Sequence, residues 1–286
     1  MPGLMRKGLS MKHFCIIANE EKDPGGRIAK QIAESFSEKG CRAYVISPII
    51  PGTEYGEVKL EEGTDCAVIL GGDGTFLRAA KVLLPYGIPV MGINLGHLGF
   101  LTAAEYQDAE KAVSKLVAGE YVIENRTLLT TSYQGNACGM LALNDIVIAR
   151  SGFSRLIRLR LSVNGQEVEN YQGDGVILAT PTGSTGYSLS AGGPVVSPVA
   201  HTLVITPICP HMLHARPLIV SEDDVITVEV CRSSRSMEKE AQVTVDGDEV
   251  LALAVGETVT IQKAPGVVPV VMLKDISFWE RVRGKL

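Results

Sequence analysis

The sequence of 286 residues contains no long apolar run of the kind that spans a membrane. Near its start, the basic residues Arg6, Lys7 and Lys12 are followed only by a five-residue apolar stretch at 14–18. A signal-peptide core needs about 7–15 apolar residues, and a membrane-spanning helix needs about 20. We therefore expect a cytoplasmic protein that has no membrane partner.

The chain also lacks an excess of basic residues. Its 27 Lys and Arg residues are outnumbered by 32 Asp and Glu residues, which gives a formal net charge of −5. A protein with this balance has no global positive field that would recruit nucleic acid, so we expect no nucleic-acid partner. Any site for a polyanion must gather its positive potential locally.

The six cysteines lack the spacings of zinc sites and redox motifs. Cys66 stands directly before the apolar residues 67–70, a setting typical of reduced, buried thiols. His211 and His214 lie three residues apart in a proline-flanked segment, with no carboxylate or cysteine at ligand spacing. A structured loop is favoured over a metal site there, and we expect no metal bound by the protein's own side chains.

The first part of the chain alternates short apolar strands with amphipathic helices. Such alternation is typical of a parallel sheet covered by helices, so we predict a Rossmann-like α/β domain over residues 1–120. Gly40 is expected to end the first helix. The predicted strands are 13–18, 42–47, 66–70 and 89–93, and the predicted helices are 28–36, 76–84 and 105–118.

The pattern changes near residue 121. Apolar and polar residues alternate over 158–163, and the pairs Asn164-Gly165 and Asp246-Gly247 predict hairpin turns. We predict an antiparallel, β-sandwich-like domain over residues 121–286, which makes the fold class α/β plus all-β.

Helices are expected to be short and few in this second domain. One is predicted near 185–192 and another at the C-terminus, where Ser277 and Glu280 have the spacing of a capping box. The C-terminal tail is expected to return toward the first domain. A cleft between two domains is a usual place for a ligand.

The segment Gly71-Gly72-Asp73-Gly74-Thr75 follows an apolar strand and precedes a helix. Glycines allow the backbone to approach phosphates closely, and a helix N-terminus supplies free N–H groups and a positive dipole end. Asp73 would repel an anion, so a carboxylate here suits a general base or a holder of a divalent metal. The alternative is a tight turn in which Asp73 caps the helix.

Two further segments interrupt apolar strands with polar residues. Residues 94–101, Asn-Leu-Gly-His-Leu-Gly-Phe-Leu, form a glycine-rich loop that by itself fits a structural role as well as a functional one. His97 within it is expected to be an ordinary loop residue. Asn144 and Asp145 break an apolar run, and they suit sugar hydroxyls and an adenine edge, or else a turn before a strand.

The fourth segment joins Gly173-Asp174-Gly175, the apolar strand 176–179 and the hydroxyl-rich residues 180–190. Hydroxyls and free N–H groups are what a pyrophosphate or ribose site needs, and Tyr187 suits contact with a base. A flexible loop would have a similar composition, but the adjoining buried strand argues against one.

In this order, the four segments resemble the NAD kinase family. The Gly-Gly-Asp-Gly-Thr motif alone is shared with diacylglycerol and sphingosine kinases, and a near variant occurs in phosphofructokinases. The segments 94–101 and 180–194 resemble the corresponding motifs of NAD kinases and do not resemble those of the lipid kinases. The resemblance spans roughly residues 66–247. It implies transfer of the γ-phosphoryl group of ATP to the 2′-hydroxyl of the adenosine ribose of NAD, giving NADP and ADP.

The resemblance implies roles in the first domain. Asp73 would accept the proton of the 2′-hydroxyl as that oxygen attacks the γ-phosphorus. Gly74 and Arg78 would lie near the phosphates or ribose of NAD, and Phe100 would pack on a nucleotide ring.

It also implies roles in the second domain. Asn144 and Asp145 would hold the adenosine portion, and Arg155 stands in the family's basic position after that strand. Asp174 would bind the nicotinamide end or the ligand of a neighbouring chain. The predicted adenine and ribose pocket, with the rest of this NAD-binding stretch, comprises Thr185, Gly186, Tyr187, Ser188, Leu189 and Ser190.

Two positions depart from the family's pattern. Gly186 stands where alanine is more common, and the change should be mild because both residues are small. Asp248 stands where glutamine is frequent. An acid there would either alter discrimination at the edge of the ligand or lie in a solvated turn.

The same resemblance implies the substrates NAD and ATP, a divalent cation that we expect to be Mg²⁺ carried by ATP, and a homodimer or homotetramer. No Walker A sequence is present, so no P-loop lysine holds the donor. A lipid kinase would instead need an apolar groove and often a basic membrane face. A non-catalytic dinucleotide-binding regulator would gain nothing from Asp73. The choice of donor, of NAD or NADH as acceptor, and any feedback control stay open.

Overall fold

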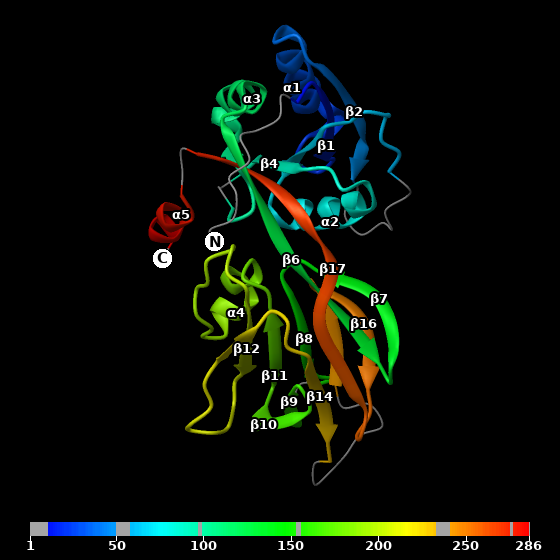
Figure 1. The fold of residues 1–286 in the computed structure, drawn as a ribbon, viewed down its shortest axis with the longest axis vertical. Coiled ribbons are helices and arrows are strands. Elements are labelled where there is room, and N and C mark those ends of the chain that lie inside the picture. The colour runs from blue at the N-terminus through cyan, green and yellow to red at the C-terminus, as the bar shows by residue number, and fades with distance from the viewer. Residues whose placement is uncertain are drawn as a thin grey trace. The chain divides into compact units, whose positions relative to one another are not determined.

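The computed structural model describes residues 11–49, 58–96, 99–152, 156–232, 241–274 and 277–285. The chain forms two compact units: unit 1 comprises Met1–Asn125 and Val268–Leu286, and unit 2 comprises Arg126–Val267 (Figure 1). Two strands, β6 (Tyr121–Tyr133) and β17 (Thr258–Leu273), run from one unit into the other. The end of the chain therefore belongs to the same unit as its beginning.

Unit 1 is built on a parallel sheet in which the strands lie in the order β2-β1-β3-β4. Strand β5 and the end of β17 also pair in parallel with β4. The strands are β1 (His13–Asn19), β2 (Arg42–Ile49), β3 (Cys66–Gly71), β4 (Val90–Asn94) and β5 (Ala104–Glu105). The helices are α1 (Arg27–Glu38), α2 (Asp73–Leu83), α3 (Ala109–Ala118) and α5 (Phe278–Lys285). The short 3-10 helices are η1 (Pro24–Gly26), η2 (Leu84–Tyr86) and η3 (Tyr106–Asp108).

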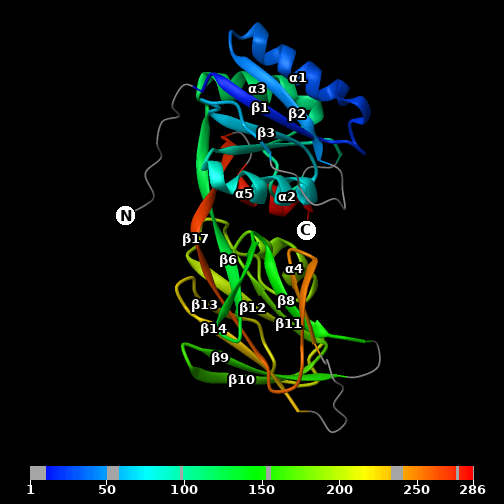
Figure 2. The same ribbon diagram turned by 90° about the vertical axis from the view of Figure 1, so that its right-hand side faces the viewer.

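Helices cover both faces of this sheet. Helices α1 and α3 lie on one face and α2 lies on the other (Figure 1, Figure 2). Strands β1, β3 and β4 are buried along their whole length, which is why their sequences are almost continuously apolar. Phe14 of β1 stacks on Phe36 of α1 with ring centroids 4.1 Å apart. Gly40 follows α1 with a φ of +70°, as the predicted helix end requires.

Two helix boundaries differ from those predicted. Helix α2 begins at Asp73, three residues before the apolar repeat that starts at Phe76, because its first three residues, Asp-Gly-Thr, carry no apolar repeat. Helix α3 begins at Ala109, since residues 104–108 form β5 and η3 instead. The first difference matters for function, because it makes Asp73 the first residue of a helix.

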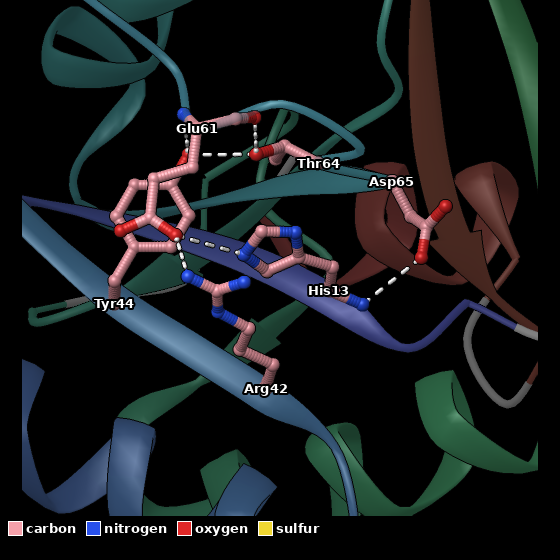
Figure 3. Close-up of polar contacts among 6 residues, drawn as sticks. All are labelled: His13, Arg42, Tyr44, Glu61, Thr64 and Asp65. Carbon is pink, nitrogen blue, oxygen red and sulfur yellow. Dashed lines mark hydrogen bonds and ion pairs between the residues drawn. The ribbon is translucent and has the colours of Figure 1, made fainter.

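A polar network closes the amino edge of the parallel sheet and consists of His13, Arg42, Tyr44, Glu61, Thr64 and Asp65 (Figure 3). The Glu61 carboxylate lies 2.6 Å from the Arg42 guanidinium and 3.3 Å from Nε2 of His13. The Asp65 carboxylate accepts the backbone N–H of His13 at 2.9 Å, and the hydroxyls of Tyr44 and Thr64 are 2.7 Å apart. Nε2 of His13 makes no hydrogen bond within the described residues, but the other groups bond to one another, which indicates a structural role at this edge.

Unit 2 contains two antiparallel sheets. One has the order β10-β9-β14-β17, with β6 next to β17 and β7 next to β6, and the other has the order β13-β12-β11-β8-β15-β16. Its elements are β7 (Asn136–Ala142), β8 (Asp145–Arg150), β9 (Ile157–Val163), β10 (Gln166–Gly173), β11 (Gly175–Ala179), η4 (Gly183–Thr185), α4 (Tyr187–Ser190), β12 (Thr202–Ile208), β13 (Leu218–Ser221), β14 (Ile226–Cys231), β15 (Ala241–Val245) and β16 (Asp248–Leu253).

An apolar core lies between the two sheets of unit 2. Ile148 and Leu178 from one sheet and Leu159 and Val228 from the other are all fully or almost fully buried in it. The turns Asn164-Gly165 and Asp246-Gly247 have positive φ at both residues, as tight hairpin turns require. A parallel α/β unit and an antiparallel sandwich confirm the predicted fold class.

Three of the six cysteines are buried, as predicted for reduced structural thiols, but Cys209 is exposed. Burial raises the pKa of the Cys15 thiol to about 12 and also raises the pKa of Cys66. These two thiols are therefore held in the unreactive, protonated form. Within the described residues, no helix is both long and apolar enough to cross a membrane.

Candidate active site

The candidate site of unit 1 lies at the carboxyl edge of its parallel sheet. Strands β1, β3 and β4 are neighbours, so their last residues, Asn19, Gly71 and Asn94, lie along one edge. In open α/β sheets, ligands bind outside this edge. The predicted Gly-Gly-Asp-Gly-Thr loop leaves the middle one of these three strands.

Hydrogen bonds from Asn19 tie the loop after β1 to the start of α2. Its side-chain Nδ2 donates to Thr75 Oγ1 at 2.9 Å, and its Oδ1 accepts the backbone N–H of Glu21 at 2.9 Å. Thr75 in turn leaves no room for a side chain on Gly71, where a Cβ would stand 2.6 Å from the Thr75 side chain. Gly71 is thus required by close packing within the protein.

The Asp73 carboxylate is held by the loop that follows β4. Asp73 opens α2 after Gly72, and its two oxygens accept the backbone N–H groups of Phe100 at 3.0 Å and Leu101 at 3.4 Å. A Cβ on Gly99 would stand only 1.8 Å from Oδ1 of Asp73. The carboxylate therefore does not cap its own helix, and the two glycine-rich segments found in the sequence form one structure.

Gly74 and Arg78 differ from the tightly packed glycines of this loop. Gly74 is exposed, and a Cβ placed on it would meet no heavy atom within 4 Å. Nε of Arg78 is buried, with no hydrogen-bond partner among the described residues. Gly74 is therefore not required by close packing, and no hydrogen bond within the described residues accounts for Nε of Arg78.

Phe100 contacts the C-terminal helix. Its ring lies 6.2 Å from the Phe278 ring, and Nζ of Lys285 lies 4.9 Å from its centroid. Its predicted contact with a nucleotide ring stays a prediction. His97, expected to be an ordinary loop residue, lies outside the described residues.

A separate group of predicted residues lies in unit 2, at the turn between β7 and β8. The Asp246 carboxylate accepts three consecutive backbone N–H groups, from Leu143 at 2.9 Å, Asn144 at 2.8 Å and Asp145 at 3.1 Å. The predicted Asn-Asp pair is thus held in place by an acid about 100 residues away in the sequence.

Asp145 is buried, with 6% of its surface exposed. Burial raises the pKa of its carboxyl to about 7, and the nearby negative charge of Asp246 adds to the increase. A carboxyl with such a pKa changes protonation near neutral pH and can donate as well as accept a hydrogen bond. A strongly raised pKa of this kind is common in functional sites, although structural charge pairs cause it too.

The hydroxyl-rich segment packs directly against the Asn-Asp pair. The backbone N–H of Thr180 donates to the Asn144 carbonyl at 2.9 Å, and Gly183 lies so close that a Cβ would stand 2.1 Å from that oxygen. A Cβ on Gly186 would lie 3.8 Å from Asn144 Nδ2 and 3.9 Å from Asp145 Oδ2. The third and fourth sequence segments therefore form a single surface.

Only some of the hydroxyls in this segment are accessible. Ser184 and Ser188 are fully buried, and the Ser188 hydroxyl lies 2.8 Å from that of Thr206. Tyr187 is 49% exposed and Ser190 is exposed as well. These contacts describe an ordered turn, not a flexible loop. The other predicted residues of the segment are half-buried, namely Thr185, Gly186 and Leu189.

Other predicted residues lie elsewhere in unit 2. Asp174 forms an ion pair with Arg150, in which Nε lies 2.7 Å from Oδ1. Arg155 lies outside the described residues, and Asp248 is exposed at the start of β16. Across the described residues, no group of three or more His, Cys, Asp or Glu side chains is placed to hold a metal ion.

Sequence reasoning missed three residues that shape these surfaces: Asn19, Lys22 and Asp246. Asn19 could have been found, because it ends a strand as Gly71 does. Lys22 is exposed, and its Nζ lies 3.0 Å from where a Cβ on Gly72 would stand, which places a positive charge beside the glycine-rich loop. Asp246 was recognised only as a turn residue, and its contacts depend on the tertiary fold.

The α/β fold and an acid beside a glycine-rich loop at the strand ends fit one class of protein, a phosphotransferase. Two family models match the chain: ATP-NAD kinase N-terminal domain at residues 14–121, and ATP-NAD kinase C-terminal domain at residues 143–273. The chain belongs to the NAD kinase family. Members of this family phosphorylate NAD with ATP, which decides against the lipid kinase alternative.

Similar proteins span nearly the whole chain. An NAD kinase of Lachnoclostridium phytofermentans is 44% identical over 281 residues, which cover 96% of this chain and 99% of that protein. An NAD kinase of Ruminiclostridium cellulolyticum is 39% identical over 285 residues, which cover 96% and 98%.

Solved structures agree with this fold. An NAD kinase from Archaeoglobus fulgidus in complex with ATP has a TM-score of 0.73 and 30% identity, and the match covers 96% of this chain and 98% of that one. Yeast NADH kinase complexed with NADH has a TM-score of 0.74 over 96% and 86% of the two chains. Its identity is 24%, so this second likeness supports the fold alone.

Proposed function

We propose that Asp73 is the general base for transfer of the γ-phosphoryl group of ATP to the 2′-hydroxyl of the adenosine ribose of NAD. The observation that carries this proposal is the Asp73 carboxylate at the first residue of α2, held by the N–H groups of Phe100 and Leu101. A general base must be fixed in direction and open to its substrate, and Asp73 is only partly buried.

The proposed step is a direct displacement without a phosphoenzyme. Asp73 takes the proton of the 2′-hydroxyl while that oxygen forms a bond to the γ-phosphorus. The bond between the γ-phosphorus and the bridging oxygen of ATP breaks, and its electrons leave with ADP. Such a transfer depends mainly on alignment and on neutralisation of charge.

The other predicted residues are proposed to bind NAD. Gly74 and Arg78 would contact its phosphates or ribose, because the described residues leave the space beside Gly74 open and give Arg78 Nε no hydrogen-bond partner. Asn144 and Asp145 would hold the adenosine portion through groups that both donate and accept hydrogen bonds. Lys22 adds a positive charge that suits a phosphate beside the loop. The remaining proposed contacts are Phe100, Arg155, Asp174, Thr185, Gly186, Tyr187, Ser188, Leu189 and Ser190.

We further propose that a divalent cation, Mg²⁺, arrives bound to ATP. Phosphate oxygens are ligands that Mg²⁺ prefers, and it commonly keeps several waters with only one or two protein carboxylates. When bound, the cation would neutralise charge on the transferred group. Within the glycine-rich loop, Asp73 is the residue whose carboxylate could hold such a cation.

The substitution Asp73→Asn tests this proposal. It keeps the size of the side chain but removes the proton acceptor, so kcat should fall by about 10²–10⁴-fold. Affinity for NAD should change by less than about threefold, since an amide oxygen still accepts N–H bonds. NADP formation is measured with ATP and Mg²⁺ through an NADP-specific dehydrogenase, and NAD binding is measured by calorimetry.

Asp108→Asn is the matched control, because Asp108 is exposed directly before helix α3 and accepts no capping hydrogen bond. It should keep wild-type kcat. Near-normal turnover by Asp73→Asn would contradict the proposed role. The same assay, run with other triphosphates, polyphosphate or NADH, identifies the preferred donor and acceptor. The proposal also includes a homodimer or homotetramer and a cytoplasmic location, which sedimentation and cell fractionation test.

A further inference from the structure

Helix α5 contacts the short segment that holds the proposed base. Its residue Arg281 is only 3% exposed although it carries a charge. Nη1 of Arg281 donates to the carbonyl oxygen of Gly99 at 3.4 Å and to the carbonyl oxygen of Thr102 at short distance. Both views place α5 on the side of the sheet where α2 lies (Figure 1, Figure 2).

Two further side chains of α5 contact the same segment through the ring of Phe100. The Phe278 ring lies 6.2 Å from the Phe100 ring, and the Lys285 ammonium lies 4.9 Å from the Phe100 centroid. An aromatic pair and a cation over a ring both stabilise folded proteins. Segment 99–102 is therefore fixed to α5 through its backbone and through its largest side chain.

The opposite side of segment 99–102 faces Asp73. The N–H of Phe100 donates to one carboxylate oxygen at 3.0 Å, and the N–H of Leu101 donates to the other at 3.4 Å. Within the segment, the N–H of Gly99 donates to Thr102 Oγ1 at 3.2 Å. Carbonyl oxygens thus point to Arg281 while N–H groups point to Asp73.

One peptide unit makes both contacts. The Gly99 carbonyl and the Phe100 N–H belong to the same planar group, so the carbonyl accepts from Arg281 while the N–H donates to Asp73. A flip of this peptide would turn its carbonyl oxygen toward the carboxylate and lose the N–H bond. Glycine makes such a flip easy, because it has no Cβ to restrict its backbone.

We propose that Arg281 is a positioning residue for phosphoryl transfer, because it fixes the Gly99–Phe100 peptide with its N–H toward the Asp73 carboxylate. This inference rests on the proposed role of Asp73 as the base. A charged donor on the carbonyl also polarises the peptide and strengthens its N–H as a donor. Loss of Arg281 would leave Asp73 present but free to turn away from the acceptor hydroxyl.

The test uses Arg281→Met and Arg281→Lys in the full chain. Small errors in the position of a reacting group can cost about 10²-fold in rate. We expect Arg281→Met to lower kcat by about tenfold or more while KM for NAD and ATP changes by less than about threefold. Arg281→Lys keeps a charged donor, so it should recover part of the lost kcat.

Two control variants on α5 separate positioning from stability. Arg283 is exposed two residues further on, and Arg283→Met should leave kcat unchanged. Ser277→Ala removes the hydroxyl that accepts the Glu280 N–H at 3.2 Å and so weakens the helix start. It should lower the melting temperature without the fall in kcat. A kcat that follows the melting temperature through all four variants would overturn the proposal.

A double-mutant cycle with Asp73→Asn completes the test. If Arg281 acts through Asp73, adding Arg281→Met to Asp73→Asn should cause almost no further loss of kcat. Fully additive losses would contradict the proposal for Arg281 alone. Near-normal turnover by Asp73→Asn itself would instead contradict the proposed function and remove the basis for this inference.

Discussion

The carboxyl group of Asp145 is buried beside the negative charge of Asp246, and both conditions make its ionisation unfavourable. Its pKa of about 7 in the folded protein lies far above the ordinary value of 3.8 expected for the unfolded chain. Between these two pH values the folded state binds more protons than the unfolded state, so the free energy of unfolding falls as pH rises. Asp145 therefore favours the folded protein least above pH 7, where it is ionised in both states.

Asp145→Asn should remove this pH dependence, because an amide resembles the protonated carboxyl and does not ionise. Each pKa unit corresponds to about 1.4 kcal/mol. Between pH 5 and pH 8, the free energy of unfolding of the wild-type protein should therefore fall by on the order of 2 kcal/mol more than that of the variant. Urea unfolding at these two pH values measures the difference. Asp108→Asn should keep the wild-type slope, and parallel slopes for Asp145→Asn would show that the site does not ionise in this range.

Gly74 offers a separate test of contact with the ligand. Its neighbours leave open space for a methyl group, and alanine is favoured over glycine in a helix by about 1 kcal/mol. Gly74→Ala should therefore keep or raise the melting temperature. If NAD lies against this backbone, KM for NAD should still rise by about tenfold, because the methyl group occupies the ligand's place.

Gly284→Ala is the matched control for Gly74→Ala. Gly284 is also helical, and a Cβ there would also meet no atom within 4 Å. It should leave KM unchanged. An unchanged KM in Gly74→Ala would place NAD away from this residue.

At the scale of elements, the β15–β16 hairpin acts as a support for a distant turn. Its residue Asp246 has a positive φ of 49° and still directs its carboxylate to three N–H groups of the β7–β8 turn. Asparagine adopts this backbone conformation about as readily as aspartate does, so Asp246→Asn keeps the hairpin. The substitution removes one acceptor oxygen and the charge next to Asp145.

Asp246→Asn should therefore have two linked effects. KM for NAD should rise by about tenfold, because one N–H of the turn loses its acceptor and the turn loosens. The pKa of Asp145 should fall, because a negative charge beside it is gone, so the pH dependence of unfolding should become shallower. Kinetics and urea unfolding measure the two effects, and an unchanged pH dependence would contradict the coupling between the two acids.

The elements themselves could largely be predicted from the sequence. Buried strands such as β3 are recognisable because both faces of a parallel sheet are covered, which makes the sequence continuously apolar. The hairpins at Asn164-Gly165 and Asp246-Gly247 follow from the local backbone preference of two residues. Helix starts were less accurate, because the first turn of α2 lacks the apolar repeat that marks the rest.

At the scale of the whole molecule, contacts between distant segments could not be predicted. The sequence indicates that Asp73 and segment 94–101 are both special, but only the fold brings Phe100 to the carboxylate. Arg281 stands in a short helix whose capping box marks only the helix start, and its partners lie about 180 residues earlier. Such partners are set by strand order and crossover connections, which local sequence patterns do not encode.

The discontinuous chain of unit 1 also has a consequence for biosynthesis. Unit 2 is one uninterrupted stretch inserted between the two parts of unit 1. On the ribosome, unit 2 emerges complete while unit 1 still lacks the last part of β17 and α5. Domains generally fold in their order of synthesis, but here unit 1, whose synthesis starts first, is completed only after unit 2. Because Arg281 belongs to α5, the nascent chain would acquire a fully oriented Asp73 only after α5 has been synthesised.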